Sequence, residues 1–192
     1  MLSQALQFVL ETIGNLFLVA LLLRFYMQLM QVSFRNNPFA QFIVALTDFA
    51  VRPLRRVIPG LWGMDLATLL LAWLIEFALL LTLYWLDGFP FLAAGASVLP
   101  GFILLAIVRL VKLGLYMIIG LIFIQALLSW VNPFSPMAPV FNSLTSPFLR
   151  PVQRVMPPVG NVDLSPLVVM LICQLLIMLP ITWLERHALT LV

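Results

Sequence analysis

Charged and chemically reactive side chains are both scarce in this chain. Only 9% of its 192 residues are charged and 64% are hydrophobic, whereas soluble domains carry roughly 25% charged residues. The single cysteine, Cys173, excludes an internal disulfide and any metal site built from paired cysteines. Its glycines are scattered, and no phosphate-binding glycine loop, zinc-ligand spacing, serine nucleophile elbow or carboxylate pair occurs. We therefore expect neither enzyme activity nor a bound cofactor or metal.

The chain contains four long apolar stretches. Residues 2–23, 66–86, 98–131 and 165–184 are apolar enough to cross a bilayer, which takes about 20 residues. The first stretch has no basic residue before it and Arg24 directly after it, which is the reverse of a signal peptide. We therefore expect an all-α multi-pass membrane protein whose first span is retained, with Arg24 in the cytoplasm.

The chain also contains an internal repeat with an offset of 98 residues. The segment 52–59, Arg-Pro-Leu-Arg-Arg-Val-Ile-Pro, returns as Arg-Pro-Val-Gln-Arg-Val-Met-Pro at 150–157, and Asp65 returns as Asp163. Such a repeat predicts a tandem duplication of a unit that contains a span, an amphipathic interfacial helix and a second span. We assign residues 1–86 to the first unit, 87–98 to a connector and 99–192 to the second unit.

The repeat bears on the number of crossings. Four crossings place both basic loops on the same membrane face, whereas a fifth crossing, made by residues 87–108, would send the second loop outside. The positive-inside rule does not decide, because seven of the ten basic residues lie inside with four crossings and eight with five. We predict four crossings, since two nearly identical basic loops suit the same face.

Each basic loop has the three- and four-residue spacing of an amphipathic helix. In the first loop we expect Asn37 and Pro38 to start the helix and Pro53 to end or kink it. A helix with one apolar face and arginines on the other lies in the headgroup plane of a membrane. We expect Asp65 and Asp163 to cap the spans that follow. The apolar positions are Phe39, Phe42, Ile43, Leu46, Phe49 and Ala50, then Met137, Val140, Phe141, Leu144, Phe148, Val152 and Val155.

Two arginine pairs are candidate contacts for a ligand. Arg52 with Arg56, and Arg150 with Arg154, share a helical face at i and i+4. Because guanidinium groups fit phosphate, each pair could bind an anionic phospholipid or an acidic partner protein. The simpler interpretation is an anchor that only fixes orientation, since each basic residue near an anionic leaflet contributes roughly 1 kcal/mol.

Glu76 is the other candidate. It lies in the middle of a span, where a carboxylate costs on the order of 2.5–3.5 kcal/mol, and its repeat equivalent is Gln174. We expect this pair to hydrogen-bond across the helices between the two units, with Arg109 or Lys112 as a counter-charge. The alternative is a path for ions or protons.

One combined motif extends over most of the second unit. It comprises Ser129-Trp130, Pro147, Arg150-Pro151, Arg154, Pro157, Gly160 and Asp163-Leu164-Ser165-Pro166. The first unit keeps Pro38, Arg52-Pro53, Arg56, Pro59, Gly63 and Asp65. It departs from the motif with Gln31-Val32 in place of Ser-Trp and Ala67-Thr68 in place of Ser-Pro. The combined motif resembles that of the YggT/YlmG family.

This resemblance implies a multi-pass protein of the bacterial inner membrane without catalytic residues, linked to cell division or osmotic-stress tolerance. We therefore expect a scaffold or assembly factor that contacts anionic phospholipids and either a membrane-protein partner or a second copy of itself, with no nucleic acid bound directly. The alternative function is a small transporter or channel, or a transport accessory, that affects ion or osmolyte balance through Glu76 and Gln174.

Overall fold

In the computed structural model, the described part of the chain is helical and contains no strand. It comprises residues 2–32, 37–56, 58, 65–132, 134–156 and 163–192. The spans are α1 (Leu2–Leu29), α3 (Leu66–Leu86), α5 (Leu99–Val131) and a composite helix of α7 (Ser165–Leu176), the π-helical η2 (Ile177–Ile181) and α8 (Thr182–Leu189). All four are long and apolar enough to cross a membrane, which confirms the expected all-α membrane protein.

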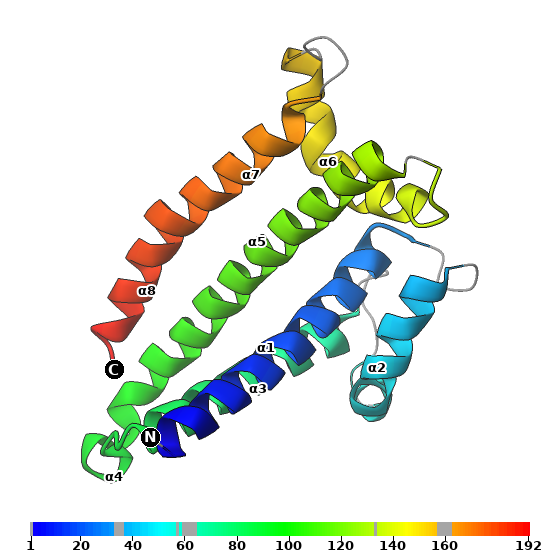
Figure 1. The fold of residues 1–192 in the computed structure, drawn as a ribbon. Coiled ribbons are helices and arrows are strands. Elements are labelled where there is room, and N and C mark those ends of the chain that lie inside the picture. Colours follow the sequence, from blue (N-terminus) through cyan, green and yellow to red (C-terminus); the bar gives the residue numbers. More distant parts are fainter. Residues whose placement is uncertain (1, 33–36, 57, 59–64, 133, 157–162) are drawn as a thin grey trace.

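The central helix of the bundle is α5. On one side it packs against α1 and α3, and on the other against α7 and α8 (Figure 1). Both chain ends lie at the end of the bundle where α3 passes into α5. The two amphipathic helices, α2 (Pro38–Arg55) and α6 (Ala138–Val155), connect the spans at the opposite end. This arrangement agrees with four crossings and places both basic helices at the same end.

Residues 87–98 do not extend α5 into a fifth crossing. They form two short helical pieces, α4 (Phe91–Ala94) and the 3-10 turn η1 (Gly95–Val98). Gly88 has a φ of 82° and Gly95 a φ of 66°, a backbone conformation that favours glycine. The chain therefore turns twice within this segment instead of running straight.

The start of α2 is as expected. The Asn37 Oδ1 accepts hydrogen bonds from the amides of Phe39 (2.9 Å) and Ala40 (3.4 Å), and Pro38 is the first helical residue. Pro53 lies in the last turn of the helix, which ends two residues later at Arg55. This end lies close to the position where the sequence predicts that Pro53 ends or kinks the helix. In the second unit α6 likewise contains Pro147 and Pro151, and it bends along its length (Figure 1).

Both amphipathic helices pack against the bundle with part of their apolar surface. In α2 the buried residues are Ala40, Ile43, Thr47 and Val51, and in α6 they are Phe141, Leu144, Thr145 and Leu149. The outer faces differ, because α2 leaves Phe42, Leu46 and Phe49 exposed, whereas α6 exposes mainly polar residues and prolines. The hydroxyl of Tyr26 on α1 donates to the carbonyl oxygen of Leu144 on α6 at 2.5 Å. This hydrogen bond links α6 to the first unit.

Candidate functional site

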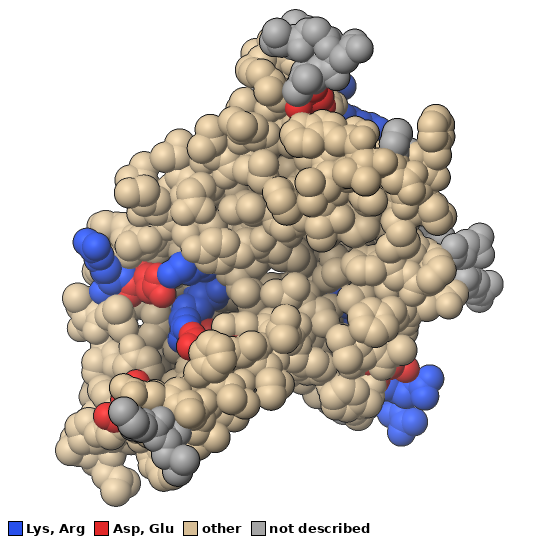
Figure 2. Space-filling model, viewed as in Figure 1, with Lys and Arg blue, Asp and Glu red and all other residues tan. Residues whose placement is uncertain are grey.

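On the face shown in Figure 2, the charged side chains gather in a few small groups on an otherwise uncharged surface. On α2, Arg52 is exposed and forms an ion pair with Asp48 at 3.4 Å. Arg56 is also exposed and, within the described part of the chain, has no acidic partner. The two arginines that the sequence pairs on one helical face therefore differ, since Arg52 has an acidic partner and Arg56 has none among the described residues.

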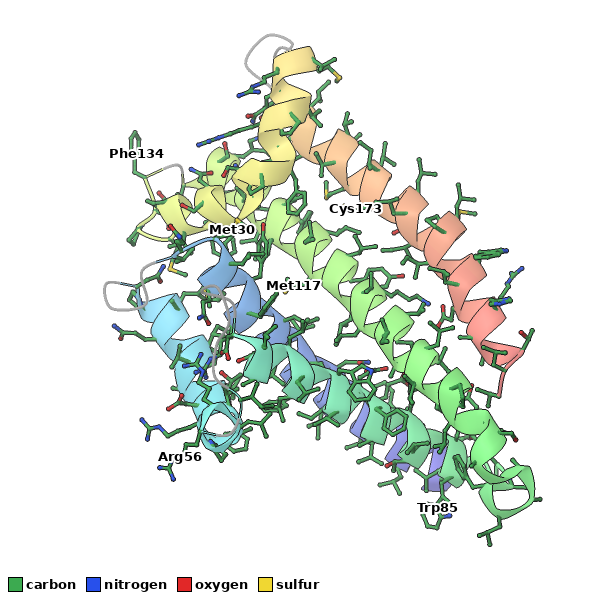
Figure 3. All side chains as sticks on the ribbon, turned by 180° about the vertical axis from the view of Figure 1, so that it is seen from behind. Met30, Arg56, Trp85, Met117, Phe134 and Cys173 are labelled. Atoms are coloured by element: carbon green, nitrogen blue, oxygen red, sulfur yellow. The ribbon has the colours of Figure 1, made fainter. Side chains whose placement is uncertain are left out.

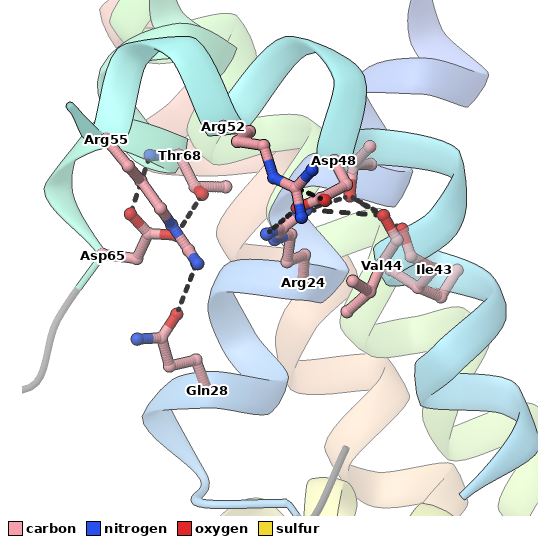
Figure 4. Close-up of polar contacts among 10 residues, drawn as sticks. Arg24, Gln28, Ile43, Val44, Asp48, Arg52, Arg55, Asp65 and Thr68 are labelled. Carbon is pink, nitrogen blue, oxygen red and sulfur yellow. Dashed lines mark hydrogen bonds and ion pairs between the residues drawn. The ribbon is translucent and has the colours of Figure 1, made fainter. Parts of the chain in front are cut away.

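A second arginine, Arg24 of α1, shares the carboxylate of Asp48. Its side chain is only 3% exposed, and its guanidinium donates to Asp48 Oδ1 at 3.1 Å and to Thr47 Oγ1 at 2.9 Å (Figure 4). The same group lies 3.5 Å from the Val44 carbonyl oxygen. The sequence indicates only a topology signal at Arg24, whereas the structure shows that Arg24 is a polar link between α1 and α2. The polar pair Thr47-Asp48, which follows the apolar positions Ile43 and Leu46 in α2, is the signal that could have indicated this partner.

Asp65 is the N-cap of α3 and also an ion-pair partner of α2. Its carboxylate accepts from the Thr68 amide at 3.3 Å, from the Thr68 hydroxyl and from the Arg55 guanidinium, which also lies 3.5 Å from Gln28 Oε1 (Figure 4). Burial raises the pKa of Asp65, but the hydrogen bonds from Arg55 and Thr68 and the charge of Arg55 outweigh burial and lower the pKa below its ordinary value. This carboxylate therefore ties the end of α2 to the start of α3.

The second unit repeats this arrangement without a full charge pair. Asp163 accepts from the Ser165 amide at 2.9 Å and from the Gln153 amide at 2.8 Å, and Gln153 occupies the repeat position of Arg55. Burial acts to raise the pKa of Asp163, but hydrogen bonds from Ser165 and Gln153 lower it overall. The N-cap position of α7 itself is Leu164, so Asp163 caps the helix from one residue earlier than Asp65 does.

We expect Asp65→Ala to destabilise the protein by about 1–2 kcal/mol at pH 7, the usual range for loss of a side-chain cap. Because the folded-state pKa of Asp65 is lowered, its contribution is complete above the unfolded value of about 3.9 and is lost as the pH falls through the folded value. Thermal unfolding in detergent should therefore show a smaller difference between variant and wild type at pH 3 than at pH 7. Asp163→Ala is the control and should cost less, since Gln153 is neutral. An equal difference at both pH values would contradict the prediction.

On α6, Arg150 and Arg154 are both exposed, and no acidic side chain among the described residues pairs with either. The position that corresponds to Asp48 is Ser146. The second unit therefore presents two uncompensated arginines where the first presents one.

Glu76 lies in a charged cluster inside the bundle. Its side chain is 3% exposed and lies 3.5 Å from Arg109 Nε, while Arg109 Nη2 donates to Glu11 Oε1 at 3.1 Å. Arg109 on α5 thus joins carboxylates of α1 and α3. Glu11 and Arg109 are 98 residues apart, so they occupy the same position in the two units and face each other across the contact between their first spans.

Gln174 does not take part in this cluster. It is exposed on α7, and α5 lies between α7 and α3 (Figure 1), so the structure does not bring the expected partners Glu76 and Gln174 together. A second ion pair joins Lys112 on α5 to Glu185 on α8 at 2.6 Å. The sequence predicts Arg109 or Lys112 as a counter-charge of Glu76, but it does not predict that Glu11 pairs with Arg109 or that Glu185 pairs with Lys112. The repeat offset, which aligns Glu11 with Arg109, is a signal that could have indicated the first of these pairs.

Comparison with known protein families identifies the family to which this chain belongs. The family model described as CCB3/YggT matches two segments, residues 3–86 and 104–184, one in each half of the chain. The chain belongs to the CCB3/YggT family. The two matched segments also support the internal duplication, because each covers one pair of spans and the amphipathic helix between them.

The bacterial relatives are similar over nearly their whole length. The chain is 37% identical over 182 residues to an uncharacterised protein of Pseudomonas aeruginosa, covering 94% of this chain and 90% of the relative. It is 34% identical over 168 residues to the uncharacterised protein YggT of Escherichia coli K12, covering 87% and 84%. No solved structure matches. The comparisons thus establish a CCB3/YggT membrane protein, and its activity has to be argued from the arrangement of its residues.

Proposed function

We propose that this CCB3/YggT protein is a non-enzymatic scaffold of the bacterial inner membrane, which organises the membrane or assembles partner proteins through α2 and α6. The observation that carries the proposal is the concentration of accessible binding groups at one end of the bundle. Arg56, Arg150 and Arg154 are exposed there, and no acidic side chain in the described part of the chain pairs with them. In addition, α2 exposes Phe42, Leu46 and Phe49, an apolar stripe suited to lipid or to a partner helix.

The charge distribution supports a cytoplasmic position for this end. Of the described basic residues outside the interior of the spans, only Arg186 belongs to the opposite end, and Arg109 and Lys112 are paired within the bundle. An excess of basic residues marks the cytoplasmic side of a membrane protein. Basic groups at that face would contact anionic lipid headgroups or acidic partners. A role in cell division or in tolerance of osmotic stress is consistent with such a scaffold.

The test is a variant in which Arg52, Arg56, Arg150 and Arg154 are all replaced with glutamine. We expect normal membrane insertion, since Arg24, Arg35 and Arg55 remain, but fewer anionic phospholipids retained on the purified protein and fewer partner crosslinks in native membranes. The wild-type signals should also weaken with added salt, because exposed charges are screened over about 8–10 Å at physiological ionic strength. Unchanged lipid retention and unchanged crosslinks would reduce these arginines to topology signals and overturn the proposal.

A transporter, a channel or a transport accessory is the second candidate, and the charged groups within the spans favour it. Glu11, Glu76, Arg109, Lys112 and Glu185 all lie within the candidate spans, where ionisable residues often mark ion or proton paths. Each basic member is already paired, which also fits a purely structural role. Flux of ions or osmolytes in proteoliposomes that is abolished by Glu76→Gln, in a normally folded protein, would favour transport over the scaffold.

A further inference from the structure

The two units differ in what lies beneath their amphipathic helices. In the first unit the guanidinium of Arg24 occupies the space under α2 and is bonded to Asp48 and Thr47. The repeat offset places Ile122 at the position of Arg24 and Ser146 at that of Asp48. Ile122 is fully buried in an apolar cluster with Leu149. The second unit therefore has neither the internal cation nor the carboxylate of the first.

A polar hollow of about 480 Å³ lies at α6 in the second unit, next to Met30, which is labelled in Figure 3. Among the described residues that line it, none is a carboxylate and Arg150 is the one charged residue. The polar residues in its wall are Gln125, Asn142, Ser143, Thr145, Ser146, Arg150 and Gln153. By contrast, the hollow that Arg52 and Arg56 line in the first unit has about 270 Å³ and contains Asp48, which pairs with both Arg52 and Arg24. Of these two hollows, the one in the second unit combines an unpaired guanidinium with hydroxyl and amide side chains and has no carboxylate among its described lining residues.

An adjoining hollow points to a headgroup rather than a simple ion. The Gln125 side chain is held in the wall between the α5 and α6 helices, because its Nε2 donates to Asn142 Oδ1 at 3.0 Å. A second hollow of about 400 Å³ shares Met30 and Ser143 with the first and is lined in part by Val32, Met137 and Val140. The combined surface is therefore polar at one side and partly apolar at the other.

We propose that the hollow at α6 binds the phosphodiester headgroup of an anionic phospholipid, with Arg150 contacting the phosphate. In the structure the hydroxyls of Ser143 and Ser146 donate to the carbonyl oxygens of Pro139 (2.8 Å) and Ser143 (3.2 Å), and they turn to the phosphate oxygens when the headgroup binds. Arginine suits this role because its planar fork of donors matches phosphate. The site is confined to the second unit, since Arg52, which corresponds to Arg150 in the first unit, is paired with Asp48. This inference rests on the proposed function. It places the proposed contact with anionic lipid at Arg150 and the serines of the hollow at α6.

The test is a titration of the purified full-length protein with short-chain phosphatidylglycerol, followed by native mass spectrometry. Phosphatidylcholine serves as the zwitterionic control and inorganic phosphate as a competitor. We expect one phosphatidylglycerol to bind in preference to phosphatidylcholine, and Arg150→Gln to weaken that binding at least tenfold. Arg52→Gln, the matched change in the first unit, should alter it less than twofold. Equal weakening by both variants, or no preference for phosphatidylglycerol, would overturn the proposal.

Two further variants reproduce the arrangement of the first unit. Ser146→Asp places a carboxylate beside Arg150, and Ile122→Arg combined with Ser146→Asp also adds the internal cation. Because Ile122 is buried, the double variant could fail to fold, so Ser146→Asp alone is the deciding variant and should abolish the preferred binding with an unchanged melting temperature.

The remaining outcomes of the titration distinguish failure of this inference from failure of the proposed function. Full displacement of phosphatidylglycerol by millimolar inorganic phosphate would identify a free-phosphate site and contradict the lipid assignment. Loss of anionic lipid in the four-arginine variant but not in Arg150→Gln would reject the hollow and leave the scaffold proposal standing. Retention of anionic lipid by both variants would reject the two proposals together.

Discussion

Replacing Arg109 with glutamine is expected to destabilise the protein by about 3 kcal/mol, the lower end of the range for removing one partner of a buried ion pair, because Arg109 and Glu11 are 26% and 45% exposed. Arg109 lies within hydrogen-bond or ion-pair distance of both Glu11 (3.1 Å) and Glu76 (3.5 Å), and the Glu76 side chain is 3% exposed. Without Arg109, two carboxylates would face each other within the bundle with no positive group between them. Unfolding in mixed detergent micelles, followed by circular dichroism, measures the effect.

The control for Arg109 is Glu76. We expect Glu76→Gln alone to cost far less, since Arg109 keeps Glu11 as a partner and glutamine preserves the shape of the side chain. The double variant Arg109→Gln with Glu76→Gln should be more stable than Arg109→Gln alone, because the buried carboxylate is then removed together with its counter-charge. If the losses in free energy of unfolding of the two single variants simply add up in the double variant, Arg109 and Glu76 do not interact. That result would contradict a structural role for this ion-pair cluster.

Replacing Arg24 with leucine should cost about 1.5–3 kcal/mol, the range for hydrogen bonds that involve a charged group. The buried guanidinium of Arg24 is the shared partner of Asp48, Thr47 and the Val44 carbonyl, whereas Asp48 is 32% exposed and keeps Arg52 as a partner in the variant. Because α2 is joined to α1 by these bonds, we expect α2 to detach locally before the spans separate. Hydrogen exchange of the α2 amides, followed by mass spectrometry, should show faster exchange in the variant.

Arg52 offers a matched comparison, because it pairs with the same carboxylate of Asp48 from the exposed side. With 76% of its side chain exposed, Arg52→Leu should change stability by only about 0.3–0.5 kcal/mol, as is typical for exposed pairs spaced i and i+4. A loss for Arg52→Leu as large as that for Arg24→Leu would contradict the assignment of Arg24 as the buried link.

The parts of the fold that follow from hydrophobic length and repetition could be predicted from the sequence. The four spans need only about 20 apolar residues each, and the duplicated basic loops indicate one common end. The π-helical turn at Ile177–Ile181 could not be foreseen, although Pro180 lies within it. The end of α2 at Arg55, two residues after Pro53, lies close to the predicted end or kink at that proline.

The candidate sites were harder to predict, because pairing depends on the direction in which each side chain points. Glu76 and Gln174 are equivalent by sequence, but one faces α5 and the other is exposed on α7. Similarly, Arg52 and Arg150 occupy equivalent positions, and a single change from aspartate to serine four residues earlier leaves only Arg150 unpaired. Sequence repetition therefore located the residues, whereas their partners depended on the packing of α1, α2 and α5.

The meeting of Glu11 and Arg109 at one repeat position has a consequence for how the two halves recognise each other. A chain built from two first units would place glutamate against glutamate at this contact, and one built from two second units would place arginine against arginine. Either combination would bring like charges together in a low-dielectric setting, where repulsion is strong. The two halves are therefore complementary rather than interchangeable. Expressed as separate polypeptides, they would favour assembly with one copy of each, since that combination alone pairs opposite charges.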